Sequence, residues 1–245
     1  MDSIFDFFTN IAGLLSSDDG FATLRILLII SISIIVGILA GNSAVVVFNR
    51  MPAHWLCDYN VEPSDELKQR DVQRIKSHPW KAFFSMVFVL CAIKLAVFDW
   101  QYAFAVIVSL WALLIIAISD KKYMIIPDQF VIVLALSAVG YVPYHDGFLE
   151  PVFGALLGSG CMLLIGIVGK LIFKREALGF GDVKLFGAVG LIAGLVGTAT
   201  ILIMCSLLSC FHFAILLIRK KIKRTDVMPL GPYIAIATAI YLVVF

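Results

Sequence analysis

Charged residues are scarce in this chain. Only 15% of its 245 residues are Asp, Glu, Lys or Arg, whereas 61% are hydrophobic, and the mean hydropathy is +1.00. This composition leaves too little polar surface to coat a water-soluble globule of the same length. Lipid must therefore solvate most of the protein, and we expect residues 1–245 to form a single membrane domain.

The chain also has few residues suited to binding a metal or a nucleic acid. Of its five cysteines only Cys57 lies in a polar segment, so neither a disulfide framework nor a zinc site of four thiolates is available. The four histidines are scattered without ligand spacing. The net charge of +2 is small, and the basic residues form no continuous stripe. We therefore expect no metal and no nucleic-acid partner.

Basic residues are missing from the first twenty positions, which instead carry several aspartates. This is the opposite of the basic start of a secretory signal. Apolar residues recur there at helical spacing, at Ile4, Phe7, Phe8, Ile11 and Leu15. Residues 1–20 are therefore predicted to form an amphipathic, interfacial helix on the periplasmic surface of the membrane.

Apolar runs separated by short polar breaks predict an all-α, polytopic membrane protein. A bilayer core about 30 Å thick needs about 20 apolar residues per helix. The sequence contains eight candidate spans, at 22–48, 82–98, 101–119, 129–144, 151–173, 183–197, 198–218 and 230–245. The division at Gly197 has an alternative interpretation, in which Gly194 and Gly197 only bend one long helix.

The basic residues favour that division. With eight spans, all of the 19 lysines and arginines except Arg25 and Lys94 fall on one side of the membrane. The positive-inside rule makes that side cytoplasmic. Both chain ends then lie outside, and the longest polar loop, 49–81, lies in the cytoplasm.

Asp120 and Asp182 are predicted to lie at the same cytoplasmic boundary, since one ends the third span and the other begins the sixth. Ionisable residues in such places are candidates for function, although a solvated helix end or a helix cap is a simpler interpretation. Capping does not explain Gly179 and Gly181, which allow a tight turn and a close chain approach before Asp182. Two neighbouring carboxylates can share a proton and activate a water against a peptide carbonyl.

Three short segments stand out around these acids and before the last apolar run: Asp-Lys-Lys-Tyr-Met-Ile-Ile-Pro-Asp at 120–128, Glu-Ala-Leu-Gly-Phe-Gly-Asp-Val-Lys at 176–184, and Met-Pro-Leu-Gly-Pro-Tyr at 228–233. In this order and spacing they resemble the motifs of the type IV prepilin peptidases, bacterial inner-membrane aspartic proteases of the GxGD class. The resemblance covers most of the chain.

The resemblance implies that Asp120 and Asp182 are the catalytic pair of a peptidase core at 101–245, acting without a cofactor. It gives supporting places to the other motif residues, Gly179, Gly181, Lys184, Pro127, Asp128, Gly231 and Pro232. Among them we expect Lys184 to be a solvated lysine and Asp128 a helix cap. The implied substrates are prepilins or pseudopilins, whose basic leader is cut after a glycine at the cytoplasmic face of the membrane.

Many members of this family also methylate the new N terminus with S-adenosylmethionine, and loop 49–81 is the region expected to support that activity. The resemblance is weaker here, because Val45 stands where the family has an asparagine and Cys57 cannot supply two zinc-binding Cys-x-x-Cys pairs. The loop mixes acidic with basic residues. It is either a solvated connector or a surface that holds a basic leader.

Two other functions are alternatives. A proton-coupled transporter could use Asp120 and Asp182 as membrane carboxylates, but a proton path should place acids across the bilayer and not at one boundary. A presenilin-type intramembrane protease shares Gly-x-Gly-Asp but cuts within a span. Such proteases carry Pro-Ala-Leu, whereas this chain has Pro-Leu-Gly-Pro at 229–232.

Overall fold

The computed structural model of the protein describes residues 20–57, 62, 63, 67, 73–174, 178–221 and 228–244. Within these residues the regular structure is helical and contains no strand, which confirms the predicted all-α class. Five of the helices are long and apolar enough to cross a membrane, so the chain is a polytopic membrane protein. Residues 1–19, most of the predicted amphipathic helix, lie outside the described residues.

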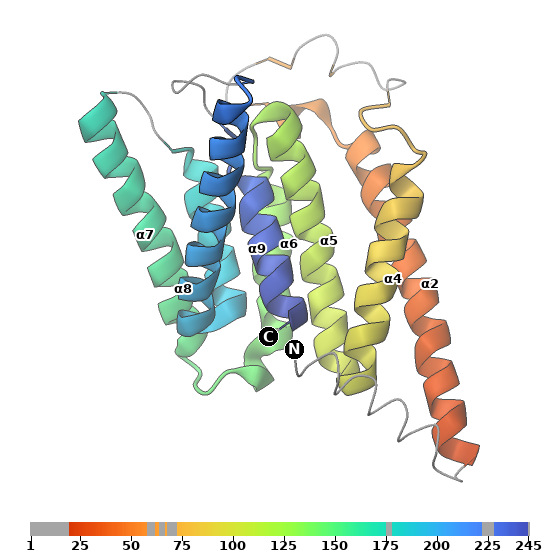
Figure 1. Ribbon diagram of the computed structural model, residues 1–245. Coiled ribbons are helices and arrows are strands. Elements are labelled where there is room, and N and C mark those ends of the chain that lie inside the picture. The colour runs from red at the N-terminus through yellow and green to blue at the C-terminus, as the bar shows by residue number, and fades with distance from the viewer. Residues whose placement is uncertain are drawn as a thin grey trace. The chain divides into compact units, whose positions relative to one another are not determined.

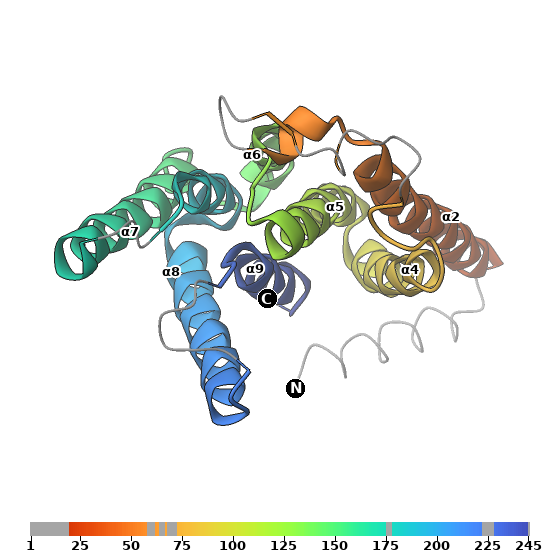
Figure 2. The same ribbon diagram turned by 90° about the horizontal axis from the view of Figure 1, so that it is seen from above.

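The chain divides into two compact units, the first comprising Met1–Met51, Arg70–Trp111 and Val244, and the second comprising Pro52–Gln69, Ala112–Val243 and Phe245. In the first unit α2 (Gly20–Arg50) packs against α4 (Trp80–Phe98), as Figures 1 and 2 show. A Cβ on Gly41 would collide with the backbone of Ser85. Small residues at helical spacing allow membrane helices to approach each other this closely.

Two side chains close the base of the polar loop that follows α2. The Asn49 amide binds Ile75 at both ends, accepting from its N–H at 2.8 Å and donating to its carbonyl at 3.0 Å. Arg74 Nη1 donates to the carbonyl oxygens of Met51 at 2.6 Å and Phe48 at 3.2 Å. The bonds of Arg74 satisfy carbonyls at the end of α2, where a helix leaves its carbonyl groups unpaired. Most acids of the loop lie outside the described residues, so both interpretations of the loop stay predictions.

The second unit contains the end of α5 (Trp100–Tyr123), the short η1 (Ala53–Leu56) and the helices that follow α5: α6 (Asp128–Ser137), η2 (Ala138–Tyr144), α7 (Glu150–Phe173), α8 (Phe180–Ile218) and α9 (Gly231–Val244). Helix α7 packs against α8. Gly154 and Gly190 meet there backbone to backbone, and a Cβ on either would collide with the carbonyl oxygen of the other.

Helix α8 consists of two helices joined at Gly194. This residue has φ 66° and ψ −172°, a backbone conformation that glycine adopts far more readily than other residues. Figure 1 shows the two parts of α8 running in opposite directions. The predicted division of this apolar segment is therefore present, but it lies at Gly194 and not at Gly197.

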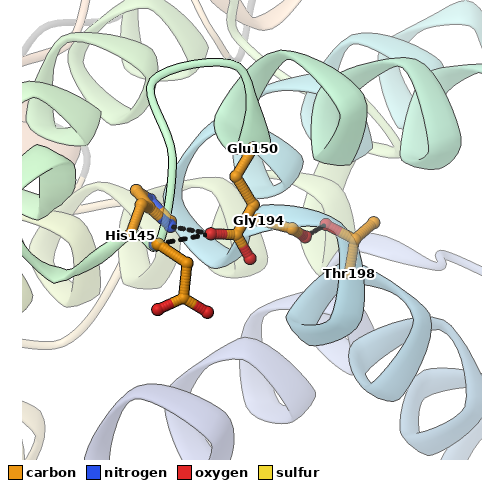
Figure 3. A network of polar contacts seen from close by, with 5 residues as sticks. His145, Glu150, Gly194 and Thr198 are labelled. Atoms are coloured by element: carbon orange, nitrogen blue, oxygen red, sulfur yellow. Dashed lines mark hydrogen bonds and ion pairs between the residues drawn. The ribbon is translucent and has the colours of Figure 1, made fainter.

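Polar side chains hold this reversal in place (Figure 3). The Thr198 hydroxyl donates to the Gly194 carbonyl. Glu150 occupies the space beside Gly194, where a Cβ would lie 2.9 Å from its Oε1. Oε2 of Glu150 accepts the Asp146 N–H at 2.9 Å and lies 3.7 Å from Nδ1 of His145. The start of α7 is thereby tied to the turn within α8.

The number of membrane crossings stays a prediction. The five long helices include α8 as one helix, and the segments Asp128–Tyr144 and Gly231–Val244 are shorter apolar helices. If the two parts of α8 cross separately, the helices correspond to the eight spans expected from the sequence.

Candidate active site

Asp120 lies near the end of α5 and is only 5% exposed. Its Oδ2 accepts the backbone N–H of Gly231, the first residue of α9, at 2.7 Å. A Cβ on residue 231 would lie 2.8 Å from that oxygen. Glycine is therefore needed for α9 to approach the carboxylate. Burial also shows that Asp120 is not a solvated helix end.

Asp182 is the third residue of α8 and is 9% exposed. Its carboxylate interacts with the backbone N–H of Gly179, the N-cap residue of the same helix. An acid at the third helical position commonly caps a helix in this way. Its Oδ1, however, is buried and has no hydrogen-bond partner among the described residues. Helix capping therefore explains only one of the two interactions that this carboxylate could make. The buried Oδ1 without a partner requires another explanation.

The two carboxylates belong to the second unit and interact with each other. Asp120 acts electrostatically on Asp182. The end of α5 and the start of α8 also lie toward the same side of that unit in Figure 1. The structure thus brings together the two acids that the sequence singled out.

The connection between α5 and α6 lies against the start of α8. Met124 has φ 55° and turns the chain out of α5, and the Ser119 hydroxyl donates to the Ile125 carbonyl at 2.8 Å. A Cβ on Gly181 would lie 3.1 Å from Cβ of Ile126. The glycine before Asp182 therefore lets the segment that follows Asp120 pack closely against α8.

Lys184 and Asp128 form an ion pair. The Nζ atom lies 2.9 Å from Oδ1 and 2.8 Å from Oδ2, and the two side chains are 34% and 32% exposed. Pro127 is the N-cap residue of α6, so Asp128 is the first residue within that helix. The expectation of a solvated lysine and a capping aspartate is therefore wrong.

Cys205 is a neighbour of the acids that the sequence did not indicate. It is 3% exposed and interacts electrostatically with Asp182 and with Tyr233. The Tyr233 hydroxyl in turn contacts Nδ1 of His212. In the sequence Cys205 is one residue of a long apolar run. The reversal at Gly194 explains its position, because Asp182 and Cys205 stand at similar distances before and after that turn.

The described residues offer no evident place for a metal, since among them no group of three or more His, Cys, Asp or Glu side chains could hold one. The residues expected to support methylation with S-adenosylmethionine differ from those of the family. Val45, a fully buried apolar side chain, stands at the position of the family's asparagine. The nearby Asn49 already uses its amide on Ile75. These two residues therefore do not supply the amide that the family has there.

Residues 107–218 match the sequence model of the type IV leader peptidase family. The chain is similar to the prepilin leader peptidase/N-methyltransferase of Pseudomonas aeruginosa, with 30% identity over 57% of this chain and 49% of the relative. It is 32% identical to the protein of the same name from Xanthomonas campestris, with the same coverage.

Leader peptidase HopD of Salmonella typhimurium is 28% identical over 51% of this chain and 82% of its own length. The chain spans about half the length of the first two relatives. No solved structure matches it.

Proposed function

We propose that the protein is a membrane aspartic endopeptidase that removes the basic leader of type IV prepilins or pseudopilins. The match of residues 107–218 to the type IV leader peptidase family supports this proposal. The observation that carries this proposal is the pairing of two buried carboxylates, Asp120 and Asp182, from two separate motifs. Burying an ionised acid is costly, and a second acid beside it adds to the cost because like charges repel. A pair that retains an unpartnered buried oxygen is suited to binding a reacting group.

The proposed reaction is hydrolysis by a water that the two aspartates activate. One carboxylate takes a proton from the water as its oxygen attacks the peptide carbonyl carbon, and the other, protonated, donates a hydrogen bond to the carbonyl oxygen. When the tetrahedral intermediate collapses, the C–N bond breaks and the leaving nitrogen receives the proton taken from the water. The Gly231 N–H holds Asp120 in place, and Oδ1 of Asp182 is the atom with a bond still to make.

We place this site at the cytoplasmic face of the bacterial inner membrane. Helices α5, α7 and α8 end on the side of the second unit where the acids lie (Figure 1). Exposed lysines stand at these ends: Lys121, Lys122, Lys174, Lys220 and Lys221. Clusters of this kind are typical of cytoplasmic membrane boundaries. A leader that is basic and precedes an apolar stem would reach the acids from that side.

The family match and the burial of the two acids both favour a peptidase over a transporter. Of the acids that the structure describes, Asp120 and Asp182 are the two that are buried, and they neighbour each other. A proton path would need acids at successive depths of the bilayer.

A proteoliposome assay tests the proposed function. The purified protein is co-reconstituted with a type IV prepilin of Pseudomonas aeruginosa, and the new N terminus of the product is read by mass spectrometry. A cut between the basic leader and the apolar stem supports the proposal. A cut within the stem would assign the protein to the presenilin type, and no cut would reject the peptidase.

Methylation of the new N terminus is a second candidate activity, because two of the relatives are named N-methyltransferases. The test adds labelled S-adenosylmethionine to the same assay. Label in the cleaved product supports the activity. Complete cleavage without label would restrict the protein to proteolysis, as the buried Val45 suggests.

A further inference from the structure

The ion pair of Lys184 and Asp128 connects the two segments that carry the acids. Lys184 lies two residues after Asp182 on the first turns of α8. Asp128 opens α6, directly after the connection that leads out of α5 from Asp120. Both oxygens of Asp128 accept bonds from the one ammonium group, at 2.9 and 2.8 Å. A carboxylate that is held at both oxygens can rotate little.

The pair is the last link in a continuous path of contacts between the acids. Ser119, beside Asp120, holds the Ile125 carbonyl at 2.8 Å. Ile126 packs against Gly181, where a Cβ would lie 3.1 Å away. The ion pair then joins Asp128 to the residue two positions beyond Asp182. Each acid therefore takes part of its position from the same four-residue connection, 124–127.

The apolar environment on one side of Lys184 limits where its ammonium group can lie. The Nζ atom stands 5.3 Å from the ring centroid of Phe180, a distance within the range of a cation–π contact. Lys184 thus has a ring on its own helix and a carboxylate on α6 as partners. Its chain is held between two elements and does not extend freely into solvent.

Stabilisation alone is a poor explanation for this pair. Both side chains are about one third exposed, at 34% and 32%, and solvent screens ion pairs of such exposure so that they add little to folding stability. Geometry is a better explanation, because catalytic groups must be held in place closely and a displacement of about 1 Å can cost roughly 10²-fold in rate.

We propose that Lys184 and Asp128 are positioning residues, whose ion pair sets the placement of Asp182 relative to Asp120. This inference rests on the proposed peptidase function. Neither residue touches the scissile bond. Their pairing holds the start of α8 against the start of α6, and the two carboxylates keep the separation that the shared water requires.

Kinetics of four variants test the inference, with cleavage of the reconstituted prepilin as the readout. Lys184→Met and Asp128→Asn each remove the ion pair, and we expect kcat to fall roughly 10- to 100-fold with KM nearly unchanged. The double variant should lose no more than the more affected single variant, since the two residues act through one contact. Lys184→Arg keeps a charge that can bind both oxygens and should retain most of the activity.

Lys121→Met is the matched control, because Lys121 is an exposed lysine directly after Asp120, and its activity should match that of the wild type. All variants are compared at a temperature where thermal scans show them folded. A loss of activity at that temperature then comes from misplaced acids and not from unfolding. Asp128→Asn nearly keeps the size and shape of the side chain and is the variant least expected to disturb folding.

The outcomes separate this inference from the proposed function. If the wild type does not cleave the prepilin, the peptidase proposal fails. If the wild type cleaves and folded Lys184→Met and Asp128→Asn cleave equally well, the positioning role is overturned and the peptidase stands. Losses that add in the double variant would also overturn it, because independent effects do not come from one contact.

Discussion

Gly231 and Asp120 are 111 positions apart, and the N–H of the glycine donates a hydrogen bond to Oδ2 of the acid at 2.7 Å. The contact gives the Pro-Leu-Gly-Pro segment a physical role. Its glycine provides the space for the carboxylate, since a Cβ would lie 2.8 Å from Oδ2. Pro232 follows in the first turn of α9, where a missing N–H costs little because the first N–H groups of a helix have no carbonyl partner within the helix.

Gly231→Ala should therefore lower cleavage while leaving the protein folded. The new methyl group must displace Asp120 or the start of α9, and we expect kcat to fall roughly 10- to 100-fold. Steady-state cleavage in proteoliposomes measures the effect. Gly160→Ala is the control, because a Cβ on this helical glycine meets nothing within 4 Å. Equal activity of the two variants would show that the contact with Asp120 does not matter for cleavage.

Gly194→Ala should destabilise the protein. Alanine at φ 66° and ψ −172° would lie in a region that glycine alone adopts readily, at a cost of about 1–3 kcal/mol, and its Cβ would also crowd Oε1 of Glu150 at 2.9 Å. Thermal unfolding in detergent, followed by the loss of helical signal, measures the change.

Gly187→Ala, in the same helix, supplies the comparison. Its Cβ would make an ordinary contact of 3.6 Å with Ser159, and replacing a helical glycine by alanine gains about 0.5–1 kcal/mol. A Gly194→Ala protein as stable as Gly187→Ala would contradict the role assigned to the reversal. Loss of cleavage by Gly194→Ala is also expected, because the reversal returns Cys205 to the neighbourhood of Asp182.

The elements and the two acids could be predicted from the sequence because each leaves a local signal. Apolar runs of sufficient length predict helices, and the glycines before Asp182 mark an unusual helix start. The place of the reversal could not be predicted, since Gly194 and Gly197 both lie in one apolar run. Which of the two glycines reverses the chain depends on Glu150, a residue of another helix that fits beside Gly194.

The contacts between motifs also leave no local signal. Lys184 and Asp128 each resemble an ordinary surface residue, and they become an ion pair only when α6 and α8 meet. Cys205 is similarly hidden among apolar neighbours. The motifs indicated which residues are candidates for the site. The tertiary structure was needed to show which of these residues contact each other.

Asn49→Ala tests whether the peptidase core is confined to residues 101–245. The substitution removes both bonds to Ile75 in the first unit, and at about 1 kcal/mol for each bond we expect stability to fall by about 1–2 kcal/mol. Cleavage by the folded protein should stay at the wild-type level. Asn42→Ala, in the same helix, is the control for the loss of an asparagine. A clear fall in kcat with Asn49→Ala, at a temperature where the protein is folded, would extend the core beyond residues 101–245.

The most direct test of the central claim is cleavage of the reconstituted prepilin by Asp120→Asn and Asp182→Asn. Each change keeps the shape of the side chain and removes its ability to take or give the proton, so both variants should fold and neither should cleave. Asp146→Asn, which alters an exposed acid, should cleave like the wild type. Undiminished cleavage by either the Asp120 or the Asp182 variant would contradict the assignment of these two carboxylates as the catalytic pair.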